Sequence, residues 1–193
     1  MKDTIFLEKV EFSKKKEKKK VTTIKLNGHP SFLNVTNQKE IITLVRDLPK
    51  GKLKYVEFYF NCGLPNLFKK KFNINYKDVK LRLVIYNVDN NNNPDKIISQ
   101  NEIVFDVNHD HSGSFKVNTE SLNLYNYDKL YIGFYILSEL NTKETNLYLR
   151  LNEKENAKTF ILSDKSNKKY EYKVPDKKNY GHQMKMYVAI EEN

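Results

Sequence analysis

Apolar side chains recur at every second position over much of this chain of 193 residues. Val79, Leu81, Leu83 and Ile85 form one such set, with basic residues among those between them. Because successive side chains of a β-strand point to opposite faces, this period predicts half-buried strands rather than helices. The same alternation also fixes which side of each strand faces the core, so it constrains the fold strongly.

Further segments show the same alternation or a short continuous apolar run. We predict strands over residues 5–10, 21–26, 55–62, 79–86, 103–107, 130–137, 147–151, 160–162, 170–174 and 184–190. Residues 130–137 are apolar at both parities, which indicates a central strand covered on both faces. Residues 40–48 fit helical spacing as well, but their β-branched content favours a strand.

Turn-forming sequences separate these predicted strands. They lie at 27–30, 49–51, 61–65, 90–95, 111–113 and 179–181. Short strands at this spacing are typical of a sandwich or barrel. We therefore predict an all-β fold, an antiparallel β-sandwich that is jelly-roll-like. One domain is expected over residues 1–193, with its core in 40–193 and an N-terminal strand and basic hairpin or linker in 1–20.

The composition excludes several classes of protein. The single cysteine, Cys62, cannot form an internal disulfide or a cysteine-based zinc site, and we expect it to be a buried strand residue. No apolar run approaches the ~18 residues of a transmembrane helix. The N-terminal residues are charged every few positions and lack the apolar region of a secretory signal. No cofactor is expected.

The net charge of +10 comes mostly from lysine, since only Arg46, Arg82 and Arg150 are arginines. One short run holds six of the lysines: Lys14, Lys15, Lys16, Lys18, Lys19 and Lys20. These residues are a candidate site for an anion or a partner. Nucleic-acid recognition relies on arginine forks and exposed aromatic rings, which the run lacks. We favour a solvated hairpin tip and do not expect nucleic-acid binding.

Two segments have part of the pattern of a metal site. Residues 89–95 carry oxygen ligands but lack the glycine of a calcium loop, and Gln100 stands where such a loop has glutamate. His109 and His111 have the spacing of two ligands on one strand face, with His182 as a third. Because both segments are rich in turn residues, we interpret the first as an Asn-rich turn and predict no metal centre. No nucleophile elbow or Gly-rich phosphate loop is present, so no enzymatic activity is expected.

The 13 tyrosines, with no tryptophan, are a weaker indication of binding. Tyr135, Tyr148, Tyr170, Tyr172 and Tyr187 lie in predicted strands and are candidates for stacking against a ligand. Packing at the rim of the core explains most of them equally well. The absence of tryptophan weakens a carbohydrate-binding interpretation.

The middle of the chain resembles a known family in the motifs of its strands and turns. The strand 79–89 is followed by a polar turn up to residue 98, the strand 102–107, and then the segments 115–124 and 130–137. The sequence motifs of these segments, such as Arg82-Leu83-Val84-Ile85-Tyr86 in the first, are similar to those of the β-sandwich domain that follows the carboxypeptidase-regulatory-like domain in Bacteroidetes-type envelope proteins. Residues 3–7 look like the last strand of that regulatory-like domain. Asn93 stands where glycine is usual before Pro94, and 135–137 lack the usual aromatic ending.

The resemblance covers residues 40–193 and implies an exported, non-enzymatic domain of the periplasm, outer membrane or cell surface. The leading hypothesis from the sequence is therefore a non-catalytic binding or structural component of a larger cell-envelope assembly, with other envelope proteins as partners. A carbohydrate-binding module, with glycans as ligands, is one alternative. A jelly-roll component of a virion or similar assembly is another. The lack of a visible signal peptide fits the envelope hypothesis only if the chain is a mature or trimmed form.

Overall fold

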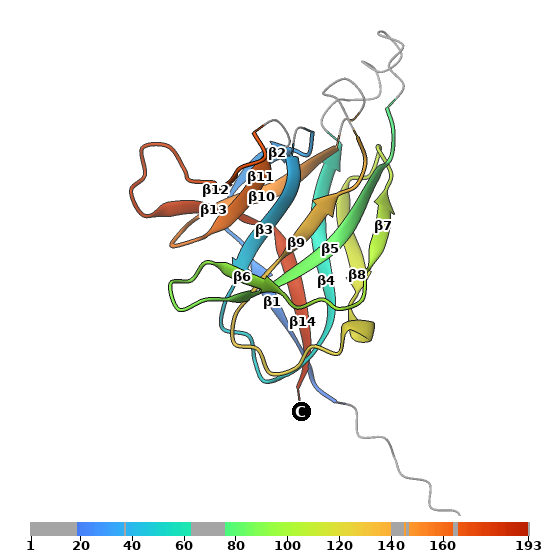
Figure 1. Cartoon of the computed structure of the whole chain (residues 1–193), viewed down its shortest axis with the longest axis vertical. Coiled ribbons are helices and arrows are strands. Elements are labelled where there is room, and N and C mark those ends of the chain that lie inside the picture. The colour runs from blue at the N-terminus through green and yellow to red at the C-terminus, as the bar shows by residue number, and fades with distance from the viewer. Residues whose placement is uncertain are drawn as a thin grey trace, which may run out of the picture.

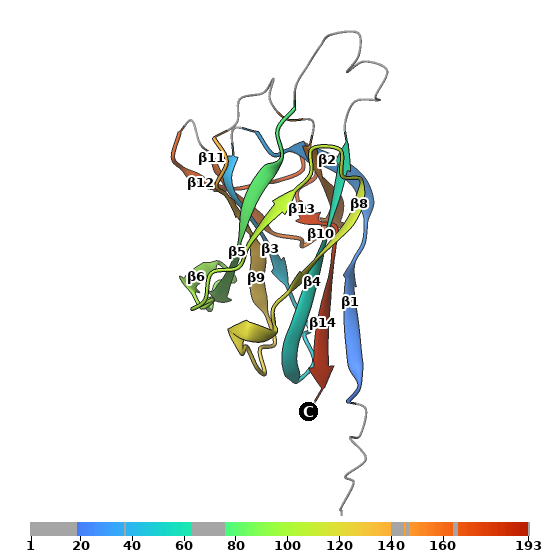
Figure 2. The ribbon, with the colours of Figure 1, turned by 90° about the vertical axis from the view of Figure 1, so that its right-hand side faces the viewer.

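The computed structural model describes residues 19–36, 38–62, 76–139, 145, 147–163 and 166–192. Within these ranges the chain forms two sheets of antiparallel strands that face each other (Figure 1, Figure 2). The predicted all-β antiparallel sandwich is confirmed. The helical content of the described ranges is one short 3-10 turn, η1 (Glu120–Leu122), and none of it has the length and apolarity needed to cross a membrane.

The first sheet, here called sheet A, carries both the first and the last strand. Its members are β1 (Val21–Leu26), β2 (His29–Asn34), β4 (Gly51–Cys62), β8 (Gly113–Asn118), β10 (Leu147–Glu155), β13 (Tyr180–Met184) and β14 (Met186–Glu192). The order is β1-β14-β4-β10-β13, with β2 on β10 and β8 on β4. The predicted strand over 184–190 is split at Lys185, between β13, which pairs with β10, and β14, which pairs with β4.

The second sheet, sheet B, forms the opposite layer. Its members are β3 (Gln38–Val45), β5 (Val79–Val88), β6 (Pro94–Ile97), β7 (Val104–Val107), β9 (Leu130–Ile136), β11 (Thr159–Ser163) and β12 (Lys169–Glu171). The order is β12-β11-β3-β9-β5-β6, with β7 on β5. Residues 40–45 are therefore strand, as their β-branched content predicted.

The core lies between the sheets and uses the faces that the period of two predicted. Val79, Leu81, Leu83 and Ile85 are each at most 2% exposed. From sheet A, Phe58 lies in the middle of an aromatic group, with its ring centroid 5.3 Å from that of Phe134 on β9. Phe58 also lies 6.3 Å from Phe105 and 6.4 Å from Phe60, measured between centroids. Burying such a side chain contributes about 1.5–3 kcal/mol, so this group anchors the two layers.

The central strand β9 is covered on both faces, as its sequence predicted. Its outward residue Tyr131 packs with Ile42, Leu44, Val84 and Tyr86 in a second apolar cluster on the far side of sheet B. On this face the strand also carries a glycine, Gly133, directly between the neighbouring strands β3 and β5. The outer cluster explains why the segment is apolar at both parities.

A buried carboxylate, Glu40, lies at the border of this outer cluster. Its side chain is 5% exposed and forms an ion pair with Lys169 of β12, with 2.6 Å between Nζ and Oε1. The hydroxyl of Tyr86 donates to Glu40 Oε2 at 2.6 Å. Because β9 lies between β3 and β5, this hydrogen bond crosses a strand, and Gly133 places no side chain in its way. Burial and the bond to Glu40 raise the pKa of Tyr86, so its hydroxyl stays protonated at neutral pH and remains a donor.

Strand β13 joins the two sheets at one edge of the sandwich. The N–H of His182 donates to the carbonyl of Tyr172, and the hydroxyl of Thr159 on β11 donates to the carbonyl of His182 at 2.6 Å. The N–H of Met184 donates to the hydroxyl of Thr43 on β3 at 3.0 Å. These polar contacts hold the sheets together where hydrophobic packing ends.

Candidate functional site on the outer face of sheet A

The outer surface of strands β1, β14, β4 and β8 carries a patch of tyrosines and lysines, here called the Tyr–Lys face. Its residues are Tyr55, Tyr59 and Tyr187 with Lys25, Lys116 and Lys185. The alternation of β4 creates it: Val56 and Phe58 are fully buried, so Tyr55, Glu57 and Tyr59 point outward.

The strand register aligns the charged residues of this face in one row. Lys116 on β8 is opposite Glu57 on β4, Glu57 is opposite Tyr187 on β14, and Tyr187 is opposite Lys25 on β1. Neighbouring strands lie ~4.8 Å apart. The backbones that carry the two lysines are therefore separated by three such spacings, or about 14 Å.

Each tyrosine ring of the face holds a lysine ammonium over its plane. Lys116 Nζ lies 3.7 Å from the centroid of Tyr55. Lys185 Nζ lies 4.5 Å from that of Tyr59, and Lys25 Nζ lies 5.2 Å from that of Tyr187. The cations are attracted by the negative face of each ring, which contributes about 0.5–1 kcal/mol at an exposed site. The lysines are thereby given preferred positions.

The tyrosines also contact each other. Tyr59 and Tyr187 meet edge to face, with their centroids 5.2 Å apart. Burial raises the pKa of Tyr59, and its contacts with Tyr187 and Glu57 raise it further. Both causes disfavour the phenolate, so the hydroxyl is a neutral donor at physiological pH. The pair gives the middle of the face a fixed shape.

The structure separates the five tyrosines that the sequence singled out. Tyr187 lies on the Tyr–Lys face, and Tyr148 lies on the neighbouring strand β10, opposite Asn61. Tyr135 lies on the outer face of sheet B beneath Arg82, and Tyr170 is exposed on β12. Tyr172 stacks on His182, with 4.3 Å between ring centroids. They do not form one site, and packing accounts for Tyr172.

Tyr55, Tyr59 and the three lysines of the face were missed at the sequence level. The alternation in residues 55–62 predicts that Tyr55 and Tyr59 point away from the core. It does not predict that Lys25 and Lys116 lie beside them, because that depends on how β1 and β8 align with the other strands. Sequence spacing offers no signal for that register, because β1 and β8 are far apart in the chain.

The lysine run is only partly described, since residues 14–18 lie outside the described ranges. Lys19 Nζ lies 3.3 Å from Glu191 Oε1, and Lys20 Nζ lies 3.0 Å from Glu192 Oε1. These two lysines therefore have carboxylate partners within the chain at the border of β14. Their role in binding a partner stays a prediction.

The Asn-rich segment is a turn between β5 and β6. The Asp89 carboxylate accepts the backbone N–H groups of Asn91 and Asn93 at 2.9 and 2.7 Å, and these bonds lower the pKa of Asp89. Asn92 adopts the left-handed conformation, with φ of 58°. The interpretation as an Asn-rich turn fits this geometry.

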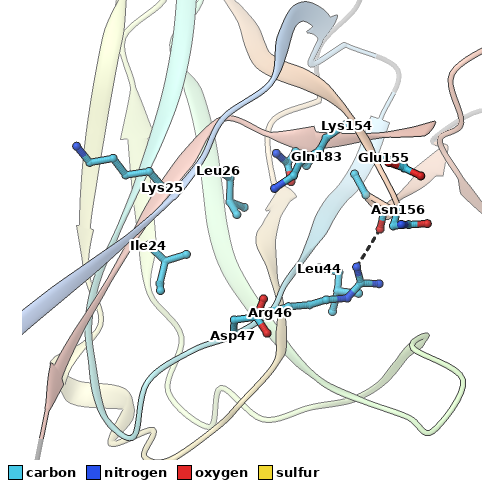
Figure 3. A pocket seen from close by; sticks show the side chains of 11 residues that line it. Ile24, Lys25, Leu26, Leu44, Arg46, Asp47, Lys154, Glu155, Asn156 and Gln183 are labelled. Carbon is cyan, nitrogen blue, oxygen red and sulfur yellow. Dashed lines mark hydrogen bonds between the residues drawn. The ribbon is translucent and has the colours of Figure 1, made fainter. Parts of the chain in front are cut away.

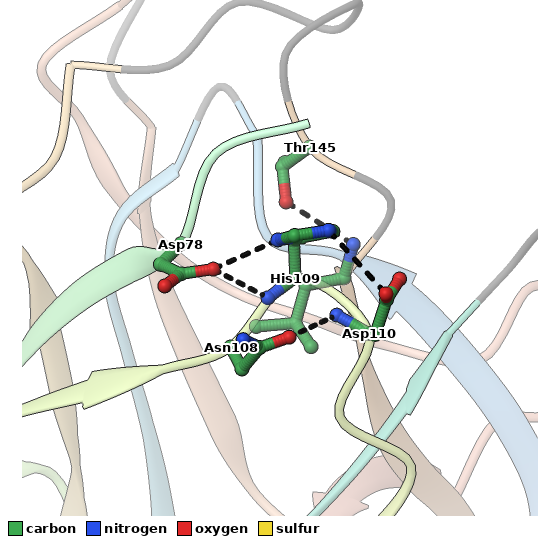
Figure 4. Close-up of polar contacts among 6 residues, drawn as sticks. Asp78, Asn108, His109, Asp110 and Thr145 are labelled. Carbon is green, nitrogen blue, oxygen red and sulfur yellow. Dashed lines mark hydrogen bonds and ion pairs between the residues drawn. The ribbon is translucent and has the colours of Figure 1, made fainter. Parts of the chain in front are cut away.

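The three histidines considered as metal ligands, His109, His111 and His182, have different partners. His109 lies between two carboxylates, with Nδ1 2.8 Å from Asp78 and Nε2 3.4 Å from Asp110 (Figure 4). His111 Nε2 contacts the carbonyl of Ser114, and His182 stacks on Tyr172. Across the described ranges, no group of three or more His, Cys, Asp or Glu side chains has a geometry that would hold a metal ion. For Cys62, only the backbone is described, paired with Leu147.

A small pocket lies where β1, the end of β3 and the β10–β11 turn meet (Figure 3). Arg46 donates to the carbonyl of Asn156 across it at 3.0 Å, and Lys25 points away from Arg46. Its volume is about 200 Å³, below the ~300–1,000 Å³ of typical small-molecule sites. This pocket is therefore smaller than a typical small-molecule site.

No protein family model and no curated protein sequence matches this chain. Solved structures that are similar in fold include two of the clostridial protein Cwp84. One contains the cysteine protease and lectin-like domains of Cwp84, a surface layer associated protein of Clostridium difficile. This match has a TM-score of 0.51 and a sequence identity of 13%, and it covers 85% of this chain and 36% of that chain. The other is the clostridial cysteine protease Cwp84 after propeptide cleavage, with a TM-score of 0.50, 13% identity and coverage of 85% and 40%. The chain thus spans well under half of either protein, and the likeness shows a shared β-sandwich fold.

Proposed function

We propose that this chain is a non-catalytic domain of the cell surface that binds a glycan through the Tyr–Lys face. The observation that carries the proposal is the Tyr–Lys face itself, a surface on which the half-buried Tyr55, Tyr59 and Tyr187 lie among cationic side chains. Tyrosine offers both an apolar ring edge and a hydroxyl, which suits the mixed apolar and polar surface of a sugar. The lectin-like domain in the similar Cwp84 structure supports the same class of ligand.

The cell-surface location has two supports. The similar structures include a surface layer associated protein. The sequence motifs of residues 79–137 also resemble those of envelope proteins. Membership of a larger envelope assembly remains a prediction from the sequence, as does the alternative of a virion component.

The non-catalytic part of the proposal is supported by the positions of the candidate catalytic groups. His182 Nδ1 lies 3.2 Å from the hydroxyl of Ser31, but the ring is 6% exposed and stacked on Tyr172. A substrate has no open approach to that pair.

Binding to immobilised cell-wall glycans tests the proposal. The substitution Tyr59→Ala is expected to weaken binding about 5-fold or more, because it removes the ring from the middle of the face. Tyr59→Phe keeps the ring and is expected to retain more affinity. Tyr170→Ala, on the exposed edge of sheet B, is the matched control and is expected to change nothing. Absence of glycan binding by the folded wild-type chain would refute the proposal.

A further inference from the structure

The lysines of the Tyr–Lys face form no ion pair with the residues that the structure describes. Among the residues that the structure describes, Lys25, Lys116 and Lys185 have no carboxylate within ion-pair distance, whereas Lys54 pairs with Glu120 at 2.9 Å and Lys177 with Glu153 at 2.8 Å. Six described lysines elsewhere have a carboxylate partner, namely Lys19, Lys20, Lys54, Lys169, Lys173 and Lys177, whereas others, such as Lys80 and Lys96, have none among the described residues. On this face their positive charge remains available to a ligand.

The positions of the same lysines disfavour stacking as the mode of binding. A sugar ring or a nucleic-acid base that stacks needs the open face of an aromatic ring. The ammonium groups of Lys116 and Lys185 lie over the faces of Tyr55 and Tyr59, only 3.7 and 4.5 Å from their centroids. A neutral ligand would have to displace these cations without offering a charge in return. An acidic ligand can instead bind the ammonium groups where they are.

The row of Lys116, Glu57, Tyr187 and Lys25 across four strands indicates the minimum length of such a ligand. Lys116 and Lys25 stand at its two ends, about 14 Å apart at the backbone. A single small anion cannot reach both. Beyond the row, Arg150 extends the positive surface onto β10, with its guanidinium 5.8 Å from the ring centroid of Phe32 on β2. The charges therefore suit a chain with repeated acidic groups that runs across the strands.

One carboxylate opposes this arrangement. Glu57 lies between Lys116 and Tyr187. Among the described residues paired across these strands with Tyr55, Glu57 or Tyr59, no other residue is acidic. A neutral sugar would use it as a hydrogen-bond acceptor. An acidic polymer would be repelled by it.

We infer that the ligand of the Tyr–Lys face is an acidic polysaccharide, bound in an extended form across the strands from β8 to β1. The inference rests on the proposed function, because it names the class of glycan for that same face. The lysines contact the acidic groups, while the tyrosines hold the lysines in place. Glu57 lowers the affinity and spaces the acidic groups along the row.

Titration calorimetry with polygalacturonate fragments of defined length, at several NaCl concentrations, tests the inference, with dextran as the neutral polymer. The triple variant Lys25→Gln/Lys116→Gln/Lys185→Gln is expected to bind polygalacturonate roughly 10-fold more weakly, since each exposed ion pair contributes up to a few-fold. The slope of log affinity against log salt is expected to become flatter by about 2. The matched control Lys80→Gln/Lys96→Gln/Lys168→Gln removes the same charge from exposed positions on and beside sheet B and is expected to bind within about 2-fold of wild type.

The substitution Glu57→Gln separates an acidic ligand from a neutral one. Affinity for polygalacturonate is expected to rise about 2-fold or more, because a repulsive charge is removed. Weaker binding after this change would overturn the inference, and so would equal affinity for monomeric galacturonate and a long fragment. Dextran binding that is independent of salt would overturn it while leaving the proposed function intact. Equal affinity for single-stranded DNA of the same charge would show a general polyanion surface and overturn the assignment to polysaccharide, and binding to no glycan at all would refute both proposals.

Discussion

The partly buried ion pair between Glu40 and Lys169 can be used to test what stabilises sheet B. We consider the substitution Lys169→Met, which keeps the length of the side chain and removes its charge. Glu40 would keep only the hydrogen bond from Tyr86, in a cluster whose other members are apolar. Breaking a fully buried pair in this way costs about 3–5 kcal/mol. Because the Lys169 side chain is 31% exposed, water relieves part of that cost, and we expect a loss of about 2–3 kcal/mol.

The double variant distinguishes a direct pair from two independent losses. Glu40→Gln alone is expected to cost about 1–2 kcal/mol, since the amide oxygen still accepts from Tyr86. Once Lys169 is gone, the same change removes the stranded charge, so the double variant is expected to be no less stable than Lys169→Met. The coupling energy of the cycle is then at least about 1–2 kcal/mol in magnitude, the cost of Glu40→Gln alone.

Urea unfolding followed by circular dichroism measures these free energies. For a domain of this size 1 kcal/mol shifts Tm by roughly 2–4 °C, so Lys169→Met is expected to lower Tm by about 5–10 °C. Lys168→Met is the matched control, because Lys168 is the exposed neighbour, and it is expected to stay within about 0.5 kcal/mol of wild type. Additive costs for Glu40 and Lys169, within ~0.5 kcal/mol, would refute the pairing.

Three further predictions concern the core and its edge. Gly133→Ala is expected to lower stability by about 1–3 kcal/mol or more, because the new Cβ would press against the carbonyl oxygen of Ile41 on β3; an unchanged Tm would argue against the close approach of these strands. Phe58→Ala is expected to cost about 3–5 kcal/mol in urea unfolding, whereas Phe32→Ala, at a side chain 49% exposed, should cost under about 0.5 kcal/mol; equal losses would contradict the assigned core. Burial lowers the pKa of His182 below its ordinary value of 6.5, so the unfolded chain takes up a proton first and stability should fall as the pH drops below about 6.5. The variant His182→Asn is expected to make the urea midpoint depend less on pH between pH 8 and 5. An unaltered pH dependence would contradict the role given to His182.

The strands that the sequence predicted well carry their evidence locally. The alternation of residues 79–85 needs only the geometry of a single strand, and the same holds for the double-sided burial of β9. Strand β2 was missed, because Asn27-Gly28-His29-Pro30 has the composition of a turn. Pro30 is tolerated there since β2 is paired on one side only, with β10, so the missing N–H breaks no ladder.

The candidate site was less predictable for a different physical reason. Parity indicates that Tyr135 and Tyr187 face away from the core, but it does not indicate which sheet each strand joins. The same ligand-stacking prediction therefore covered both tyrosines. In the structure they lie on opposite layers, Tyr135 on sheet B and Tyr187 on sheet A. The Tyr–Lys face depends on pairs such as Lys25 with Tyr187, whose alignment is set by contacts between strands remote in sequence. Only a structure supplies that register.

The pairing of the first described strand with the last has a mechanical consequence. Val21 is opposite Glu191, so the outer ends of β1 and β14 leave the sandwich at the same end (Figure 2). Force applied to both ends would load the bonds of this ladder one after another, from Val21 toward Leu26, rather than all at once. The strand pair would then unzip at low force, and the ion pairs of Lys19 and Lys20 with Glu191 and Glu192 would be the first contacts to break. A domain tethered at both ends would yield there before its core was disturbed.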